Sequence, residues 1–379
     1  MESPVRRVTL LGAAGSIGSQ TLDVFEEYAA PRSVFAVVGG ENPSALAAAA
    51  VRAKAERAVI ANPAHYTALR DALAGTNVHA MAGEEAVMAT CAERVDWLLC
   101  AISGYAALKP LWHAIPSARA VALANKEALV CAGDALRELA RRHGCALIPV
   151  DSEHAALFRL LRGANEQEAV GATITASGGA VRDLPLDALA DVTPDIAGRH
   201  PVWSMGVNIT VDSATMMNKG LETIEACRLY PFFSSDDVEA VLHREALVHG
   251  AVHWRDGGTS AYVSPSDMRL SIAQAWFYPD APPFPPPSLP KKIALTSMTF
   301  EPICPTRYPC YYMARKALTM GGLAPAILNA ANERARKLFL AGKIRFTDIA
   351  PHIAEALERV PPGEADSPES VEEAVARFA

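Results

Sequence analysis

The sequence predicts an α/β protein whose N-terminal part is a Rossmann-like, doubly wound parallel sheet. Short apolar runs of strand type alternate with helical patterns up to about residue 150, which is the pattern of a parallel sheet covered by helices. A glycine-rich turn follows the first apolar run. Alanine is abundant and aromatic residues make up only 7% of the chain, which suits helices packed closely on a sheet.

The strands expected in this first part are short and apolar. The first covers residues 8–11 and leads into the turn at 12–18, from which an amphipathic helix runs through Tyr28. An alanine-rich helix is expected at 45–55. The remaining strands are expected at 34–38, 58–60, 97–100, 120–123 and 146–150.

The pattern changes near residue 151, where loops rich in Gly, Pro and Asp separate strand-like runs. Strands are expected at 172–175, 208–211, 238–242 and 246–253, within a central α+β domain. The proline-rich run 281–290 predicts an extended, stiff linker. Helices are expected beyond it, at 311–320, 324–340, 346–359 and 370–378. The predicted domains are dinucleotide-binding (1–150), catalytic, with metal and phosphate sites (151–280), linker (281–310) and C-terminal helical (311–379).

Charge and cysteine usage limit the partners and the compartment. The net charge is −7 and the pI about 5.8, which predicts no nucleic-acid partner and no attraction to an acidic membrane. The seven cysteines are odd in number and form no C-x-x-C, so buried free thiols in a reducing compartment are expected. No apolar run approaches the ~18 residues of a membrane span, and the N-terminus lacks a secretory or transit pattern. A cytoplasmic protein is predicted, with a plastid form that has lost its transit peptide as the alternative.

Gly12, Gly15 and Gly18 follow the first strand and open a helix, the context in which a glycine-rich turn binds a dinucleotide. The alternative is a tight strand–helix turn without a ligand. Glu41 lies about where an acidic residue binds the ribose of NAD and a basic residue accepts the 2′-phosphate of NADP. Taken by itself, Glu41 favours NAD, unless it is simply a solvated loop residue.

Asp151, Ser152 and Glu153 come directly after the strand ending at Val150. In an extended chain, positions i and i+2 point to the same side, and two carboxylates there repel each other unless a cation lies between them. Oxygen ligands suit Mg²⁺ or Mn²⁺. The alternative is a helix start with Asp151 or Ser152 as N-cap, which this short pattern alone favours.

Residues 211–222 concentrate polar donors after an expected strand. Ser213, Asn218 and Lys219 suit a phosphate, and Glu222 could be a third metal ligand. The alternatives are a surface lysine and a turn asparagine. Ser177 opens a Ser-Gly-Gly turn that could present backbone N–H groups to an anion, although hairpin turns look the same. Residues 198–206, which include His200, have the composition of a lid over a ligand, with a structural histidine as the alternative.

Together these segments resemble the 1-deoxy-D-xylulose 5-phosphate reductoisomerase family. The most specific matches are at 123–127, 149–154, 199–206 and 211–222, and shorter ones follow at 308–310 and 328–333. The resemblance covers almost the whole chain in order. It implies NADPH as cofactor, with Mg²⁺ or Mn²⁺ (alternatively Co²⁺), a sugar-phosphate substrate and a homodimer. The implied reaction is a retroaldol–aldol rearrangement followed by hydride transfer, giving 2-C-methyl-D-erythritol 4-phosphate for isoprenoid biosynthesis.

The resemblance also implies residue roles. Metal ligands are Asp151, Glu153 and Glu222, and the catalytic residues are Lys126, Glu153, His200 and Lys219. Substrate contacts are assigned to Ser152, Glu153, Ser177, His200, Ser213, Asn218, Lys219 and Glu222. Cofactor contacts are assigned to Ala14, Gly15, Ser16, Ile17, Gly40, Glu41, Asn42, Asn125, Glu127 and Gly206. Trp203 and Met205 belong to the implied mobile flap.

Several positions depart from the family pattern. Ala13 and Ala14 replace a usual Ser-Thr, and Glu41 stands where a basic residue is common. Further departures occur at Val202, Asn208, 243–246, Ser266 and Ser271. Two alternatives therefore stay open, a homoserine-dehydrogenase-like oxidoreductase and a non-catalytic paralogue that senses dinucleotide or sugar phosphate.

Overall fold

The computed structural model describes residues 5–203, 206–290, 292–294 and 297–378. The chain divides into two compact units. Unit 1 comprises Met1–Ala128, Leu136–Ala155 and Asp267–Lys292, and unit 2 comprises Leu129–Ala135, Ala156–Ser266 and Ile293–Ala379. The predicted four-part division of the chain stays a prediction.

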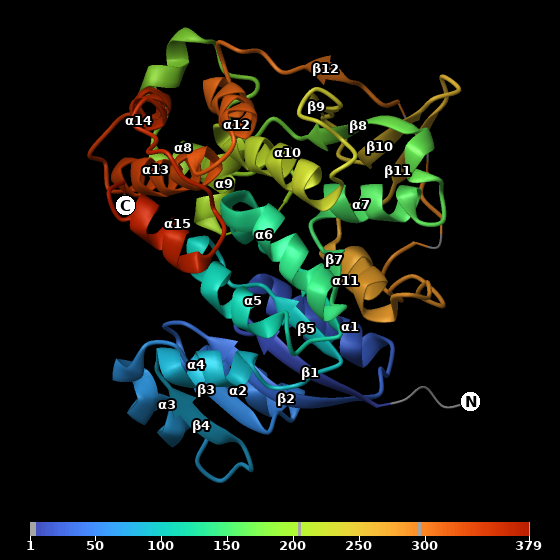
Figure 1. Cartoon of the computed structure of the whole chain (residues 1–379), viewed down its shortest axis with the longest axis vertical. Coiled ribbons are helices and arrows are strands. Elements are labelled where there is room, and N and C mark those ends of the chain that lie inside the picture. Colours follow the sequence, from blue (N-terminus) through green and yellow to red (C-terminus); the bar gives the residue numbers. More distant parts are fainter. Residues whose placement is uncertain (1–4, 204–205, 291, 295–296, 379) are drawn as a thin grey trace. The chain divides into compact units, whose positions relative to one another are not determined.

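Unit 1 is built on a seven-stranded sheet in the order β4-β3-β2-β1-β5-β6-β7 (Figure 1), and every pairing is parallel. β1 pairs with β2 on one side and with β5 on the other, so the strand order reverses between β1 and β5, as in doubly wound folds. The strands are β1 Arg6–Leu11, β2 Arg32–Gly39, β3 Arg57–Ile60, β4 His79–Ala82, β5 Trp97–Cys100, β6 Ala120–Leu123 and β7 Ala146–Pro149. The predicted fold class of this part is confirmed, and β4 is the strand that the sequence did not predict.

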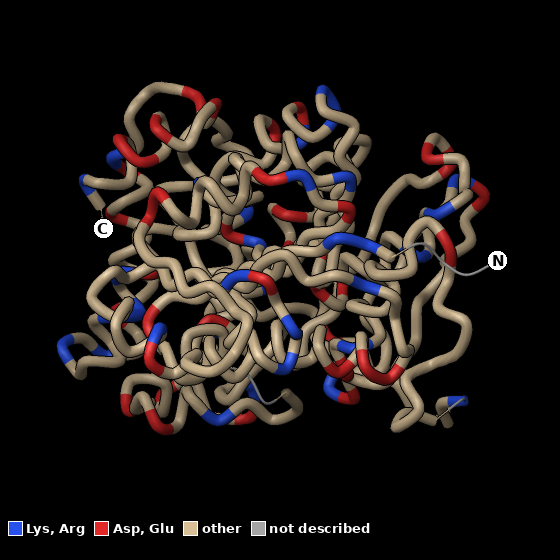
Figure 2. The backbone as a smooth tube through the Cα atoms, turned by 90° about the horizontal axis from the view of Figure 1, so that it is seen from below, with Lys and Arg blue, Asp and Glu red and all other residues tan. Residues whose placement is uncertain are grey.

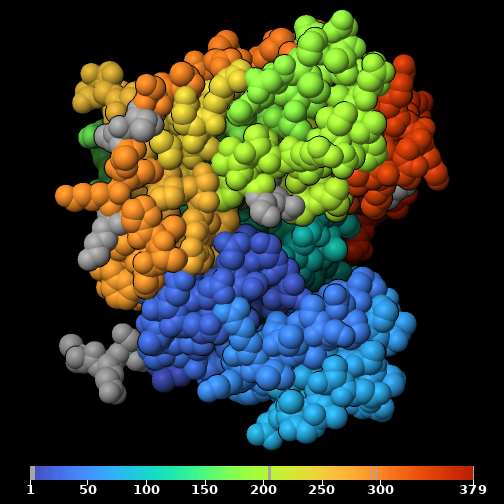
Figure 3. Space-filling model, turned by 180° about the vertical axis from the view of Figure 1, so that it is seen from behind, coloured from blue at the N-terminus to red at the C-terminus, as the bar shows by residue number. Residues whose placement is uncertain are grey.

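The helices between these strands are α1 Ser16–Glu27, α2 Pro43–Ala53, α3 Tyr66–Ala72, α4 Glu84–Cys91, α5 Leu108–Ala114 and α6 Glu127–His143, and α7 Ser152–Leu161 follows β7. Short 3₁₀ helices also occur, at η1 Pro63–His65, η2 Tyr105–Ala107, η3 Glu166–Glu168, η4 Asp187–Asp191 and η5 Phe346–Asp348. In Figure 3 the blue N-terminal residues of unit 1 form one continuous body.

A late segment of the chain returns to unit 1. Helix α11, Met268–Phe277, brings Trp276 against Phe25 and Trp97, with ring centroids 4.6 and 5.4 Å away. The proline-rich run 281–290 has neither helix nor strand, and its Phe284 stacks on Tyr28 of α1 at 4.9 Å. Aromatic contacts therefore hold this run to unit 1.

Unit 2 contains a mixed five-stranded sheet in the order β11-β10-β8-β9-β12. Its strands are β8 Ala169–Ala176, β9 Val238–Leu242, β10 Val248–Trp254, β11 Thr259–Val263 and β12 Glu301–Pro302. Its helices are α8 Pro194–Ala197, α9 Val207–Ala214, α10 Met217–Leu229, α12 Pro309–Met320, α13 Ala324–Leu340, α14 Ile349–Leu357 and α15 Pro368–Val375. The helical C-terminal region is therefore confirmed.

The predicted strand at 208–211 is wrong, because these residues belong to helix α9. Ile209 is exposed, whereas Thr210 to Ala214 are all buried. The β-branched residues Ile209, Thr210 and Val211 suggested a strand, but burial of the consecutive residues 210–214 in this helix overrides that weak preference.

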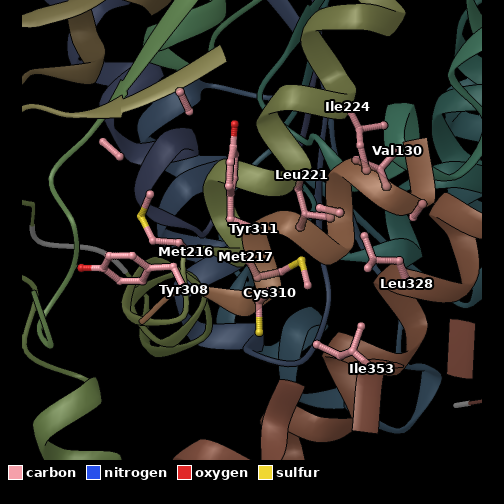
Figure 4. Close-up of a cluster of buried hydrophobic side chains, with 14 of the residues drawn as sticks. Val130, Met216, Met217, Leu221, Ile224, Tyr308, Cys310, Tyr311, Leu328 and Ile353 are labelled. Carbon is pink, nitrogen blue, oxygen red and sulfur yellow. The ribbon is translucent and has the colours of Figure 1, made fainter. Parts of the chain in front are cut away.

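Helix α10 is buried along most of its length. Figure 4 shows Leu221 and Ile224 of this helix among hydrophobic side chains that include Val130 and Leu328. Gly220 permits the close approach of α12, because a Cβ there would lie 2.5 Å from the Cβ of Ala314. The polar residues of α10 are thus carried by a rigidly packed element.

Acidic and basic residues are interspersed along the described chain (Figure 2). None of the seven cysteines forms a disulfide bond, and five of them are buried. Within the described ranges, no helix is long and apolar enough to cross a membrane.

Candidate active site

The glycine-rich turn joins β1 to α1 in unit 1. Gly12 has φ +84°, and a Cβ there would lie 2.3 Å from the carbonyl oxygen of Ala101. A Cβ on Gly18 would lie 2.5 Å from the carbonyl oxygen of Ala13. Gly15 is the N-cap of α1 and supplies no side-chain cap. The helix therefore starts close against the strand, and its first N–H groups are of the kind that bind phosphate groups.

The predicted cofactor residues Gly40, Glu41 and Asn42 follow β2. Gly40 has open space where a Cβ would project. Asn42 Oδ1 accepts a hydrogen bond from the backbone N–H of Ala45 at 3.0 Å and caps α2, a role that the sequence analysis did not assign. Glu41 is exposed and accepts hydrogen bonds from residues after β3, which are described below.

Asn125 and Glu127 hold the loop that follows β5. The Asn125 amide donates to the carbonyl oxygens of Ile102 at 2.8 Å and Gly104 at 3.0 Å, and to Glu127 at 2.7 Å. Glu127 also accepts from the backbone N–H of Gly104 at 3.2 Å. Asn125 is buried, so these two side chains give the loop a fixed shape.

Asp151 and Glu153 lie at the start of α7, directly after β7. Asp151 Oδ1 accepts from the backbone N–H of Ser152 at 3.1 Å, and the Ser152 hydroxyl donates to Glu153 at 2.6 Å. Lys126 Nζ forms an ion pair with Asp151 at 2.5 Å. The predicted extended geometry for this segment is wrong, because Ser152 and Glu153 already belong to a helix. The helix-start alternative describes the backbone, and the metal role stays a prediction.

These unit 1 residues share one edge of the parallel sheet. The glycine turn, Glu41, Asn125, Lys126 and Asp151 follow the carboxyl ends of β1, β2, β6 and β7. β6 and β7 are paired neighbours, and the Val150 N–H donates to the Leu123 carbonyl at 2.8 Å. Ligands of open α/β sheets bind at this edge.

In unit 2, His200 connects the two predicted phosphate-binding serines. Its Nε2 lies 2.9 Å from the Ser177 hydroxyl and 3.1 Å from the Ser213 hydroxyl. Its Nδ1 accepts from the backbone N–H groups of Val202 at 3.1 Å and Trp203 at 2.8 Å. Because Nδ1 accepts, the ring proton is on Nε2, which donates toward the serines.

His200 is expected to stay neutral well below pH 6.5. Burial, followed by the charges of Arg182 and Lys219, lowers the pKa of His200 to about 4. An unfolded histidine titrates near 6.5, so the unfolded chain takes up a proton at this residue before the folded protein does. The stability that comes from keeping His200 neutral is therefore present above about pH 6.5 and is lost as the pH falls toward 4. Imidazole NMR shifts between pH 3.5 and 8 test this, with the signal assigned by its loss in His200→Gln. A titration midpoint above about pH 6 would contradict it.

Asn218, Lys219 and Glu222 lie together on α10. Lys219 donates to one oxygen of Glu222, and the Asn218 amide donates to the other oxygen at 2.5 Å. Lys219 is 4% exposed and Glu222 1%. The alternative interpretations of Lys219 as a surface lysine and Asn218 as a turn residue are therefore wrong. Burying a lysine and a glutamate as a pair carries a desolvation cost. Such costly buried charges often mark functional sites.

Three buried residues beside the predicted phosphate-binding serine Ser213 were not predicted from the sequence. Asp212 of α9, next to Ser213, accepts from Asn332 Nδ2 of α13 at 3.0 Å and pairs with Arg336. Asp212, Asn332 and Arg336 are all buried. The available signal was an asparagine and an arginine four residues apart, which lie on one face of a helix.

The predicted flap precedes α9. Gly206 is the N-cap of that helix, and the Trp203 ring lies 6.4 Å from the His249 ring. Met205 lies outside the described residues.

Comparisons with known proteins agree across the chain. Family models described as 1-deoxy-D-xylulose 5-phosphate reductoisomerase, its C-terminal domain and DXP reductoisomerase C-terminal domain match residues 8–133, 147–230 and 263–378, respectively. The reductoisomerase of Caulobacter vibrioides is 45% identical over 94% of this chain and 88% of its own length. That of Rhodospirillum centenum is 42% identical over 99% and 94%.

The chain belongs to the 1-deoxy-D-xylulose 5-phosphate reductoisomerase family.

Solved structures of the reductoisomerase family share the whole fold. The Zymomonas mobilis reductoisomerase in complex with NADPH is 39% identical, with a TM-score of 0.90, and the match covers 99% of this chain and 97% of that one. A DOX-P reductoisomerase in complex with NADPH, fosmidomycin and magnesium is 31% identical, with a TM-score of 0.91, covering 99% and 95%. Family membership excludes the homoserine-dehydrogenase-like alternative.

Proposed function

We propose that this chain converts 1-deoxy-D-xylulose 5-phosphate into 2-C-methyl-D-erythritol 4-phosphate with NADPH and a divalent metal ion. The reaction is a retroaldol–aldol rearrangement followed by hydride transfer, within non-mevalonate isoprenoid biosynthesis. The observation that carries the proposal is the complete family donor set, held by specific contacts in a chain 45% identical to a named reductoisomerase. Related structures with NADPH, magnesium and fosmidomycin support the cofactor, the metal and a small-molecule ligand.

The dinucleotide is proposed to lie along the carboxyl edge of the unit 1 sheet. Ala14, Gly15, Ser16 and Ile17 would bind its pyrophosphate through the N-terminus of α1. Gly40, Glu41 and Asn42 are proposed for the adenosine end, and Asn125, Glu127 and Gly206 for the nicotinamide half. The Asn125 and Glu127 side chains act there by holding the adjoining loop.

Asp151, Glu153 and Glu222 are the proposed metal ligands. Their donor chemistry fits Mg²⁺ or Mn²⁺, because every ligand atom is a carboxylate oxygen. In the protein itself, the ammonium groups of Lys126 and Lys219 pair with Asp151 and Glu222. Such an ion supplies Lewis acidity toward the carbonyl and hydroxyl oxygens of the substrate.

The other polar residues are proposed to bind and orient the substrate. Ser177, Ser213, Asn218 and Lys219 would hold the phosphate, with the Nε2–H of neutral His200 directing the serine hydroxyls. Lys126, Ser152 and His200 would contact the sugar hydroxyls. Glu153 accepts a hydrogen bond from the Ser152 hydroxyl. It is proposed to accept the hydroxyl proton that retroaldol cleavage releases.

Trp203 and Met205 are proposed to close over the substrate as a flap that excludes water. A homodimer and a cytoplasmic location are proposed on the family resemblance. Light scattering of the purified chain tests the first, and fractionation of the producing cell tests the second.

NADPH oxidation on adding 1-deoxy-D-xylulose 5-phosphate tests the reaction. With Mn²⁺ present, absorbance at the reduced-nicotinamide band should fall, and EDTA should stop the loss because the metal is required. An absence of turnover in the presence of Mn²⁺, together with tight NADPH binding, would instead favour the sensor paralogue.

A further inference from the structure

The carboxyl ends of β2 and β3 carry an oriented acidic side chain. Glu41 Oε2 accepts from the Asn62 amide at 2.8 Å and lies 3.2 Å from His65 Nε2. A carboxylate has no proton to give, so the His65 Nε2 is the donor. The Glu41 side chain is 75% exposed, yet two partners hold one of its oxygens.

Those partners are fixed by their own backbone contacts. Asn62 Oδ1 accepts from the Ala64 N–H at 3.0 Å and caps η1, the short helix that contains His65. The Asn62 N–H also donates to the Gly40 carbonyl at 3.3 Å. Asn62 therefore uses its amide nitrogen for Glu41 and its amide oxygen for the backbone, which leaves it little freedom to turn away.

The other oxygen of Glu41, Oε1, accepts no hydrogen bond within the described part of the chain. At neighbouring Gly40, no described residue other than its two chain neighbours lies within 4 Å of where a Cβ would project. The sequence at 39–44 and 61–66, which flanks this position, contains no Lys or Arg. Glu41 therefore offers an acceptor oxygen and a negative charge at this position, and the two segments that flank it supply no permanent cation.

On the dinucleotide placement proposed above, we infer that Glu41, held by Asn62 and His65, recognises the 2′ position of the adenosine ribose, so that this chain binds NADH as well as NADPH. An acidic residue after the second strand binds ribose hydroxyls, whereas a basic one binds the 2′-phosphate. Charge repulsion at this exposed position lowers affinity for the phosphorylated ribose without abolishing it. Glu41, Asn62 and His65 are therefore specificity-determining residues for the dinucleotide.

Calorimetric binding of 5′-AMP and adenosine 2′,5′-bisphosphate tests this inference, because the two fragments differ by the 2′-phosphate alone. Glu41→Gln should raise the affinity for the bisphosphate by about tenfold and change the affinity for 5′-AMP by less than about threefold. Asn62→Ala should lower the affinity for 5′-AMP by about threefold, because the Glu41 carboxylate loses the hydrogen bond that orients it. Glu56→Gln is the matched control, since Glu56 is exposed and precedes the amino end of β3, at the opposite edge of the sheet.

NADPH and NADH are titrated in parallel into the wild-type chain. Affinities within about tenfold of each other support the inference. A fragment ratio that Glu41→Gln leaves unchanged, or that Glu56→Gln shifts equally, overturns the inference while the dinucleotide site stands. If neither dinucleotide binds, the placement of the dinucleotide fails and the inference fails with it.

Discussion

Glu153→Gln is expected to lower kcat by about 10³-fold, because it removes the charge of a proposed metal ligand, where the proposed reaction develops negative charge on oxygen. The substitution keeps the side-chain shape, and the new amide oxygen can still accept from the Ser152 hydroxyl. NADPH oxidation at saturating substrate, followed as a function of Mn²⁺ concentration, measures the loss. The concentration of Mn²⁺ needed for half-maximal rate should also rise, because the site has lost one anionic ligand.

The control for this substitution is Glu166→Gln, which makes the same chemical change at an exposed residue of η3. It should leave both kcat and the Mn²⁺ requirement as in the wild type. NADPH affinity and thermal unfolding should be unchanged in both variants. A Glu153→Gln enzyme that retained more than about a tenth of the wild-type kcat would contradict the role assigned to this carboxylate.

Arg336→Met is expected to destabilise unit 2 by about 3–5 kcal/mol, because it leaves the carboxylate of Asp212 buried without its cation. Both side chains are less than a tenth exposed. Burial raises the pKa of Asp212 even though Arg336 and Asn332 oppose the shift, so the ionised carboxylate is held at an energetic cost. Urea unfolding followed by circular dichroism measures the change in the free energy of unfolding.

Two further variants separate the lost ion pair from lost packing. Asp212→Asn combined with Arg336→Met should recover most of the stability, because the buried charge is gone and Asn332 keeps a hydrogen-bond partner. Arg345→Met breaks an exposed pair with Asp348 and should leave the free energy of unfolding almost unchanged. A double variant as unstable as Arg336→Met alone would show that packing of the arginine stem, and not its charge, is the main contribution.

Local sequence patterns were sufficient for the parallel sheet. Strands β5 and β6 begin and end at the predicted residues, because buried parallel strands appear as continuous apolar runs. The glycine turn was equally clear, since Gly12 and Gly18 meet backbone atoms that exclude any side chain. Helix α13 also has its predicted bounds, as expected of a long helix with a regular apolar face.

Local patterns failed where a distant segment decides the conformation. Residues 208–211 alternate like a strand, yet they belong to a helix whose C-terminal residues 210–214 are buried in unit 2. The predicted extended geometry of Asp151 and Glu153 was overridden by the start of α7. The proline-rich run 281–290 has no helix or strand, but its contact with Tyr28 depends on a residue 256 positions away.

The sequence by itself determined the family, the parallel sheet and the identity of the polar residues, because these depend on residue type, spacing and order along the chain. Only the tertiary structure decided which groups those residues contact. Asn332 and Arg336 reach Asp212 across 120 and 124 residues, and Asn62 and His65 reach Glu41 across a strand and a helix. Hydrogen bonds and charge pairs act over a few ångströms of space, so chain separation does not predict them.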